Sequence, residues 1–449
     1  MKARILFMLR LLLIVLISLF SFANAENANA ENVYITKKFS TKEIVRLQTS
    51  DIKTPSHELF EYHLYSMFQS VPYLEIVPID DEKIKGAKIE TFVPNFQEME
   101  EKGQNYMIYY TMVNDGSQTL ISYIVFDGLY QNTLFSGSYK TKEKIEKIAA
   151  NIANETYLAI TGEFGFFIGR LFYTQRSAST GFQVLYSQTL NFNKTPYTTD
   201  STMVTSPSYC QNGEKVFFAS RNANEMNIYA MNSITGKGRK MEIPTKNEPY
   251  LLAPEISQDC TKLFVSSLHE DGSEILMYEF SSKKLNSIVS DGNINTSPVF
   301  DDSANQIYYI SNKIFPTKIW TVFLDNPEQK YLVSRGLGGY IYLSLSPDKT
   351  KIAFVKILNN KFYLGIMDKD GANEMLLKTG YIIEEPSWAP YGNNVIVAIQ
   401  EEKKGTRSIY SISSKTGYSY PLNIAKGNIV QANWIVNESD TIAQANYHE

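Results

Sequence analysis

The feature that most constrains this chain is a repeat in its C-terminal two-thirds. Copies of one short motif start at residues 207, 254, 298, 343 and 386, so their spacing is 43 to 47 residues. A period in the mid-40s accommodates four short strands and four turns, which is the unit of a β-propeller blade. Each copy continues with apolar runs that are separated by turn pairs such as Asp271-Gly272 and Asp370-Gly371. These pairs supply the positive φ that tight hairpins need, so the repeat predicts β-structure.

Two incomplete copies of the repeat determine the number of blades. Residues 170–174 and 182–186 provide a second and a third strand without an inner strand, whereas residues 432–434 provide an inner strand with little after it. A single blade has an apolar face that it buries only against a neighbour, and ring closure removes the two unpaired ends. We therefore predict six blades over residues 163–449, in which the end of the chain completes the blade that begins near Phe164.

The start of the chain predicts export. Lys2, Arg4 and Arg10 precede or border an apolar run over residues 11–22, and the small-residue site Ala23-Asn24-Ala25 follows it. A basic start, an apolar stretch and a small-x-small site define a secretory signal peptide, here residues 1–25. The alternative is an uncleaved anchor, but the run is short for a span of roughly 20 residues. We expect a periplasmic mature protein that does not span the membrane.

A different pattern lies between the leader and the ring. The spacing of apolar residues predicts helices over 57–70, 96–102 and 142–160, and strands over 73–77, 106–110, 120–126 and 132–136. The pairs Asp115-Gly116 and Asp127-Gly128 separate the last three strands as hairpin turns, and Thr161-Gly162 ends the last helix. We predict a small α/β domain, with an extended N-terminal segment, over residues 26–162. The fold class is thus a multi-domain α/β plus all-β protein.

Charge and cysteine content limit the partners. The chain has 43 basic and 47 acidic residues, and three of the basic ones lie in the leader, so the mature surface is mildly acidic. That balance argues against nucleic acid as the main partner. Cys210 and Cys260 are the two cysteines, and they occupy repeat positions three residues apart. We expect different heights on neighbouring blades, which favours two small buried residues, with a disulfide as the alternative.

Motifs for catalysis or metal binding are not apparent. The chain has no Gly-x-Ser-x-Gly elbow, and the four histidines are not paired at the spacings of a zinc site. Asp368-Lys369-Asp370-Gly371 has the acidic spacing of a calcium loop but lacks glycine and glutamate at the required later positions, so we interpret it as a turn. We expect no catalytic residue, no metal and no cofactor. A pair of Asp or Glu residues for glycoside cleavage stays an open alternative, because such a pair is defined by the distance between its carboxyl groups in space and not by spacing along the sequence.

The repeat also predicts a binding face. In a propeller every inner strand begins at one face, so the residues just before the repeat proline line the channel mouth together. They mix apolar, hydroxyl and acidic groups, a composition typical of protein recognition. The predicted set is Thr205, Ser206, Tyr250, Leu251, Leu252, Ala253, Thr296, Ser297, residues 340–342, Glu384 and Glu385.

The order of leader, small α/β domain and six-bladed ring resembles the TolB family, the periplasmic component of the Tol-Pal system. Residues 161–173 (TGEFGFFIGRLFY) are similar to the family's junction between domains, as are the hairpin at 115–117 and residues 132–139. The chain departs from the family pattern at Cys260, at Leu343 and in the apolar loop Ile314-Phe315-Pro316.

The resemblance implies partners for two regions. In the family the channel face receives the lipoprotein Pal and is exploited by some bacteriocins, so Tyr250, Ala253, Thr296 and Ser297 are the implied Pal contacts. The family's N-terminal extension contacts the inner-membrane protein TolA, which here implies Val33, Tyr34 and Ile35. The chain is then expected to be a monomeric, non-catalytic adaptor. The alternatives are a periplasmic propeller enzyme, either a lyase or a glycosidase, and a sugar-binding propeller.

Overall fold

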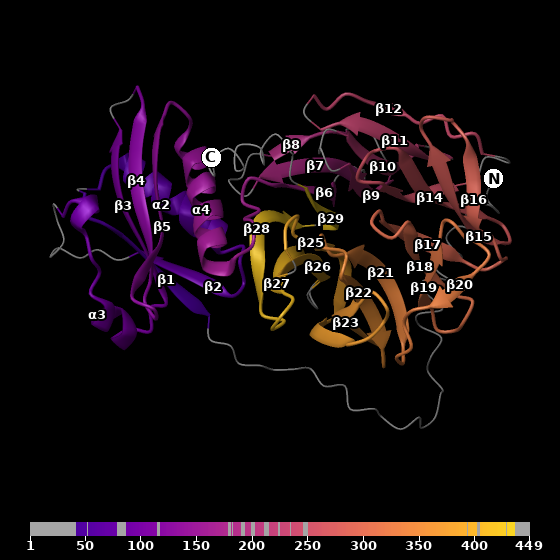
Figure 1. Cartoon of the computed structure of the whole chain (residues 1–449). Coiled ribbons are helices and arrows are strands. Elements are labelled where there is room, and N and C mark those ends of the chain that lie inside the picture. The colour runs from indigo at the N-terminus through magenta and orange to yellow at the C-terminus, as the bar shows by residue number, and fades with distance from the viewer. Residues whose placement is uncertain are drawn as a thin grey trace.

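The chain forms a small α/β domain beside a ring of β-sheets (Figure 1). In the computed structural model the described residues run from 42 to 435, with gaps at 52, 79–86, 115–116, 178–180, 182, 190–193, 199–202, 211–214, 223–224, 234, 246–249, 393, 402–404 and 428. The predicted leader, the segment that contains Val33, Tyr34 and Ile35, and the Asp115-Gly116 turn lie outside the described residues. None of the described helices is long and apolar enough to cross a membrane.

The α/β domain is built on a five-stranded sheet with the order β2-β1-β3-β4-β5. Its strands are β1 (Glu43–Thr49), β2 (Leu74–Pro78), β3 (Tyr106–Asn114), β4 (Thr119–Asp127) and β5 (Asn132–Thr141). Strand β1 was missed by the sequence prediction, yet it lies inside the sheet and pairs in parallel with both β2 and β3. The antiparallel pairs β3–β4 and β4–β5 follow the predicted hairpins.

Helices cover both faces of this sheet. Helices α2 (Pro55–Phe68) and α4 (Ile145–Thr161) pack with Ile108, Tyr110 and other residues of one face. Helix α3 (Phe96–Glu101) and the 3-10 turn η2 (Ile89–Thr91) lie over Met107 and Tyr109 on the other face. Side chains alternate along a strand, so β3 supplies both cores. Helix α4 ends at Gly162, whose φ of 74° is the left-handed conformation that a helix C-terminus commonly requires.

Six four-stranded sheets form the ring, as the repeat predicted. We call them blades I to VI in order around the ring. Blade II has β9 (Met203–Tyr209), β10 (Lys215–Asn222), β11 (Glu225–Asn232) and β12 (Gly238–Lys240), and blade III has β13 (Tyr250–Ile256), β14 (Lys262–His269), β15 (Gly272–Glu279) and β16 (Leu285–Val289). Blade IV has β17 (Asn295–Asp301), β18 (Gln306–Ser311), β19 (Lys318–Phe323) and β20 (Lys330–Leu332). Blade V has β21 (Gly339–Leu345), β22 (Lys351–Leu358), β23 (Lys361–Asp368) and β24 (Met375–Gly380), and blade VI has β25 (Ile382–Trp388), β26 (Val395–Glu401), β27 (Arg407–Ser413) and β28 (Ser419–Gly427).

Blade I closes the ring with strands from both ends of the repeat region. Its inner strand is β29 (Ile429–Ile435), which pairs antiparallel with β6 (Arg170–Arg176), followed by β7 (Gln183–Thr189) and β8 (Lys194–Pro196). This arrangement confirms the prediction that two part-blades complement each other. Closure pairs strands that would otherwise be unpaired edges, which is the physical reason for combining distant segments.

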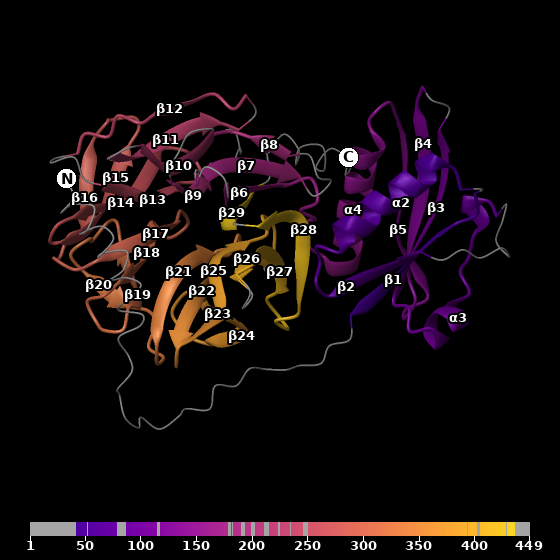
Figure 2. The ribbon, with the colours of Figure 1, turned by 180° about the vertical axis from the view of Figure 1, so that it is seen from behind.

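The α/β domain packs against blades VI and I, as both views show (Figures 1 and 2). One continuous apolar cluster joins α2 and α4 to Val397 and Trp434 of the ring. Phe166, in the segment after α4, meets the Trp434 ring edge-on at a centroid distance of 4.8 Å. The Ser411 hydroxyl of β27 donates to the carbonyl of Ser70, just beyond α2. The two parts therefore share a core and are not joined by a linker alone.

Candidate docking channel

A cavity of about 1810 Å³ runs along the axis of the ring. Its lining residues lie between Met203 and Asn433, so no described residue of the α/β domain contributes to it. One end, which we call the near mouth, is where the inner strands β9, β13, β17, β21 and β25 begin. The other end, the far mouth, is lined by residues near their ends, among them Tyr209, Gln258, Lys349 and Tyr391.

A repeated backbone distortion shapes the near mouth. The residue before the repeat proline, or before Leu343 in blade V, has a positive φ in five blades: Ser206 (51°), Ala253 (46°), Ser297 (54°), Tyr342 (54°) and Glu385 (51°). The pairing with the second strand shifts register at the same place in each of these blades. Such a β-bulge bends the strand and re-aims its side chains. The repeat therefore encodes a set of bulges around the mouth in addition to the blades.

The structure brings most of the predicted binding residues together at this mouth. Eleven of them line the cavity, namely Thr205, Ser206, Tyr250, Leu252, Ala253, Thr296, Ser297, Ile341, Tyr342, Glu384 and Glu385. Leu251 and Tyr340 do not, and this part of the prediction is wrong. The Tyr340 side chain is fully buried in the core that blade V shares with blade IV. The Leu251 side chain is only 4% exposed and packs with Leu263 and Val265 between blades II and III. Successive side chains of a strand point to opposite faces, so Leu251 points into the core while its neighbours line the channel.

Hydrogen bonds at the mouth join the closing strand to the blades on either side of it. Gln431 of β29 accepts a hydrogen bond from the Ser206 amide and donates to the Ser206 hydroxyl at 3.2 Å and to Glu385 at 2.9 Å. Two residues further on, the Asn433 side chain donates to the Pro207 carbonyl at 2.6 Å and accepts from Ser387 at 2.6 Å. Ring closure is therefore secured by polar contacts in the channel as well as by strand pairing.

Two carboxyl groups in the channel, those of Glu255 and Glu385, accept hydrogen bonds from neighbouring blades. Burial raises the pKa of Glu255 to about 7, although Ser208 and the Phe300 amide donate to it at 3.1 and 3.4 Å. Burial likewise raises the pKa of Glu385 to about 7, against the stabilising hydrogen bond from Gln431. Each carboxyl is held by groups from neighbouring blades. Desolvation is the main reason for both shifts.

Glu384 belongs to an ion-pair group at the same mouth. Arg407 contacts Glu384 at 3.0 Å and Glu401 at 2.8 Å. Burial raises the pKa of Glu384, while Arg407 opposes that shift. Repeat reasoning missed Arg407, Gln431 and Glu255, because they lie outside the residues that precede each proline. The position directly after the repeat proline carries a polar residue in three blades, namely Ser208, Glu255 and Ser387, and all three line the cavity. That regularity could have indicated a second ring of channel-lining residues, deeper than the near mouth.

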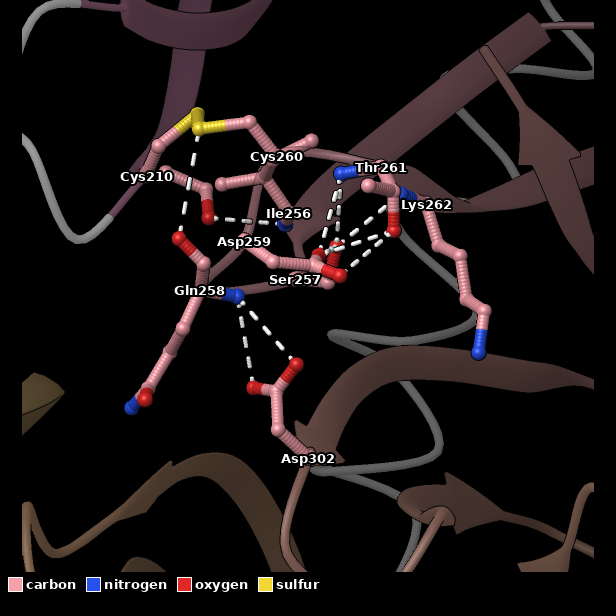
Figure 3. The surroundings of a disulfide bond; sticks show 10 residues. Cys210, Ile256, Ser257, Gln258, Asp259, Cys260, Thr261, Lys262 and Asp302 are labelled. Carbon is pink, nitrogen blue, oxygen red and sulfur yellow. Dashed lines mark hydrogen bonds between the residues drawn. A yellow bond between two sulfur atoms is a disulfide. The ribbon is translucent and has the colours of Figure 1, made fainter. Parts of the chain in front are cut away.

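The far mouth carries a disulfide that the sequence interpretation did not favour. Cys210 and Cys260 are bonded to each other, with their Cα atoms 5.3 Å apart (Figure 3). The expectation of different heights is wrong, because the three extra residues before Cys260 form a turn, in which its φ is 62°, and do not extend the strand. The bond joins blade II to blade III. Beside it the Gln258 amide donates to both carboxylate oxygens of Asp302, in blade IV, at 3.3 Å.

Metal-binding groups are not evident in the part of the chain that the structure describes. No group of three or more His, Cys, Asp or Glu side chains there is arranged to hold a metal ion. The Asp368 to Gly371 segment forms a turn between β23 and β24, in which Asp368 pairs with Lys351 at 2.7 Å. Among the described residues that line the cavity, none is a histidine.

The fold defines a six-bladed propeller with an open axial cavity that carries an N-terminal α/β domain. A family model described as the TolB beta propeller domain matches residues 157–437, more than half of the chain. The chain belongs to the TolB family.

Individual relatives agree with this assignment. The Tol-Pal system protein TolB of Gluconobacter oxydans is 24% identical over 265 residues, which cover 58% of this chain and 57% of that protein. The protein of the same name from Francisella tularensis is 25% identical over 299 residues, 63% of this chain and 67% of that one. The chain thus spans little more than half the length of the first of these relatives. The crystal structure of TolB from Acinetobacter baumannii superposes with a TM-score of 0.75 at 15% identity, covering 88% of this chain and 97% of that one, and so shows the same fold.

Proposed function

We propose that this chain is a non-catalytic periplasmic adaptor of the Tol-Pal type. It binds the peptidoglycan-associated lipoprotein Pal at the near mouth and thereby helps to maintain outer-membrane integrity and envelope constriction during cell division. The observation that carries the proposal is the gathering of eleven predicted mouth residues around one open cavity. The relatives' shared designation as Tol-Pal system proteins supports the same role.

The chemistry of the mouth supports binding over catalysis. Hydroxyl groups of Thr205, Thr296 and Ser297 alternate there with the apolar Tyr250 and Leu252. Protein interfaces commonly combine such apolar contacts with hydrogen-bonding groups. The two channel glutamates with the largest pKa shifts both accept hydrogen bonds from neighbouring blades, so their carboxyl groups tie the ring together. That arrangement supports a structural role for these acids.

A binding assay with purified Pal tests the proposal. We expect Tyr250→Asp to weaken binding strongly, because it places a charge in a half-buried apolar position, and Thr296→Arg to do so by filling the mouth. Gln258→Arg, at the far mouth of the same cavity, is the matched control and should bind like the wild type. Full affinity retained by both near-mouth variants would move the site off this face. Cleavage of an added oligosaccharide by the wild-type protein would favour the enzyme alternative.

The N-terminal segment is the proposed contact with TolA. Deleting residues 26–35, which include Val33, Tyr34 and Ile35, should abolish TolA binding and leave Pal binding intact. Retained TolA binding after the deletion would assign that contact to another surface.

A further inference from the structure

An exposed apolar patch lies beside the channel on blade IV. The loop between β18 and β19 carries Ile314 and Phe315, whose side chains are 41% and 61% exposed. The linker from blade IV to blade V adds Leu337, which is 48% exposed. Contiguous exposed apolar side chains often mark a protein interaction site, because their burial is favourable.

The patch stands on the same face as the near mouth. Strand β18 ends and β19 begins at the end of the ring where β17 starts, so residues 312–317 belong to that face. The corresponding turn of blade V places Asn360, Lys361 and Phe362 directly in the cavity lining. In blade IV, Asn312 is bonded to Ile294, another lining residue, through an amide-to-side-chain bond of 2.8 Å and a backbone bond of 3.2 Å. The loop is therefore continuous with the wall of the mouth.

Hydrogen bonds hold the loop and the linker together. Thr317 donates its hydroxyl to the Tyr340 carbonyl at 2.8 Å and accepts from the Tyr340 amide at 2.9 Å. The Lys318 ammonium group donates to the carbonyls of Gly336 and Gly338, on both sides of Leu337, at 2.6 and 3.0 Å. An apolar side chain on a fixed backbone loses less conformational entropy when it is bound. The geometry is thus suited to recognition.

We propose that Ile314, Phe315 and Leu337, which we call the blade IV patch, bind an apolar patch bordered by carboxylates on a folded protein partner. This inference rests on the proposed function, because it takes that partner to be the one that occupies the near mouth. Two exposed lysines on this face account for the carboxylates. Lys313 belongs to the same loop and lies over the Trp320 ring at 5.2 Å, and Lys361 belongs to the corresponding turn of blade V, in the cavity lining. A convex protein surface can fill the concave mouth and reach the patch together, whereas a flat lipid surface cannot.

Affinity measurements on single variants test the blade IV patch. Phe315→Ser and Ile314→Ser should each weaken Pal binding at least tenfold, and Lys361→Glu should weaken it severalfold with a reduced dependence on salt. The matched control is Phe323→Ser, which removes a 40% exposed ring from the opposite end of strand β19. It should leave the affinity unchanged. All four variants should unfold at the wild-type temperature, which shows that the changes act on binding.

The outcomes separate this inference from the proposed function. If wild-type protein binds Pal and both Phe315→Ser and Ile314→Ser bind equally well, the blade IV patch is overturned while the function stands. If wild-type protein does not bind Pal, the function itself is overturned. Two further results would assign the patch to a different partner. Dimers of the protein alone that Phe315→Ser disrupts would indicate a second copy of this chain. Flotation with phosphatidylglycerol vesicles that the same variant abolishes would indicate a lipid surface.

Discussion

Replacing Glu374 in blade V should destabilise the ring far more than replacing an exposed ionic residue of the same blade. The Glu374 carboxylate accepts hydrogen bonds from the Lys356 ammonium group at 2.6 Å and from the Tyr340 hydroxyl. The side chain of Lys356 is only 6% exposed. A second ammonium group, that of Lys318, lies 5.3 Å from the centre of the Tyr340 ring, and Lys356 lies 4.9 Å from it. Glu374 is thus the carboxylate that balances two buried cations.

The magnitude follows from what Glu374→Ala leaves behind. Two ammonium groups stay in a poorly hydrated site, where burial and the charge of Lys356 already lower the pKa of Lys318. Removing one partner of a buried ion pair costs about 3–5 kcal/mol, because the remaining charge is uncompensated. In contrast, Lys351→Ala removes an ion pair with Asp368 whose side chains are 36% and 30% exposed. An exposed pair contributes about 0–1 kcal/mol.

Urea unfolding followed by tryptophan fluorescence measures both free energies. We expect Glu374→Ala to lower the free energy of unfolding several times more than Lys351→Ala does. The double variant Glu374→Ala/Lys356→Met should recover part of the loss, because it removes one uncompensated charge. Equal effects of the two single variants, or no recovery in the double variant, would refute the reasoning.

Two further predictions concern the bond between blades and the buried acids. The double variant Cys210→Ser/Cys260→Ser should lower the free energy of unfolding by about 4 kcal/mol, because the disulfide closes a loop with a sequence separation of 50. A reductant should lower the melting temperature of the wild type and leave that of the variant unchanged. Burial raises the pKa of Glu255 and Glu385 in the channel from 4.5 to about 7, and likewise that of Glu155, which lies in helix α4 and accepts a hydrogen bond from Tyr139. The native state therefore holds protons that the unfolded chain releases between these values. Their stabilising contribution is complete below pH 4.5 and lost as the pH rises through about 7, by roughly 3 kcal/mol for each group at about 1.4 kcal/mol per pKa unit. Glu155→Gln should therefore gain stability relative to the wild type as the pH rises, in urea unfolding at several pH values; a constant difference would contradict the shift.

The sequence by itself determined the architecture of the ring. A repeat near 45 residues reports strand and turn lengths, and those are local properties of the chain. The two part-blades implied closure, because an unpaired edge is unfavourable wherever it occurs. The mouth residues before each copy of the motif followed from the same periodicity, and eleven of them line the cavity. Their place in the fold was predictable because every blade repeats it.

Only the tertiary structure decided the features that depend on contacts between distant segments. Strand β1 lies between β2 and β3 because of parallel pairing with residues far along the chain, which no local pattern reports. The cysteines pair because the turn before Cys260 folds back toward Cys210, so a count of residues along the strand misjudged their heights. Leu251 packs in the core between its two channel-lining neighbours. In each case the outcome depends on the direction of a side chain or a turn in three dimensions, whereas the repeat specifies only the order of the elements.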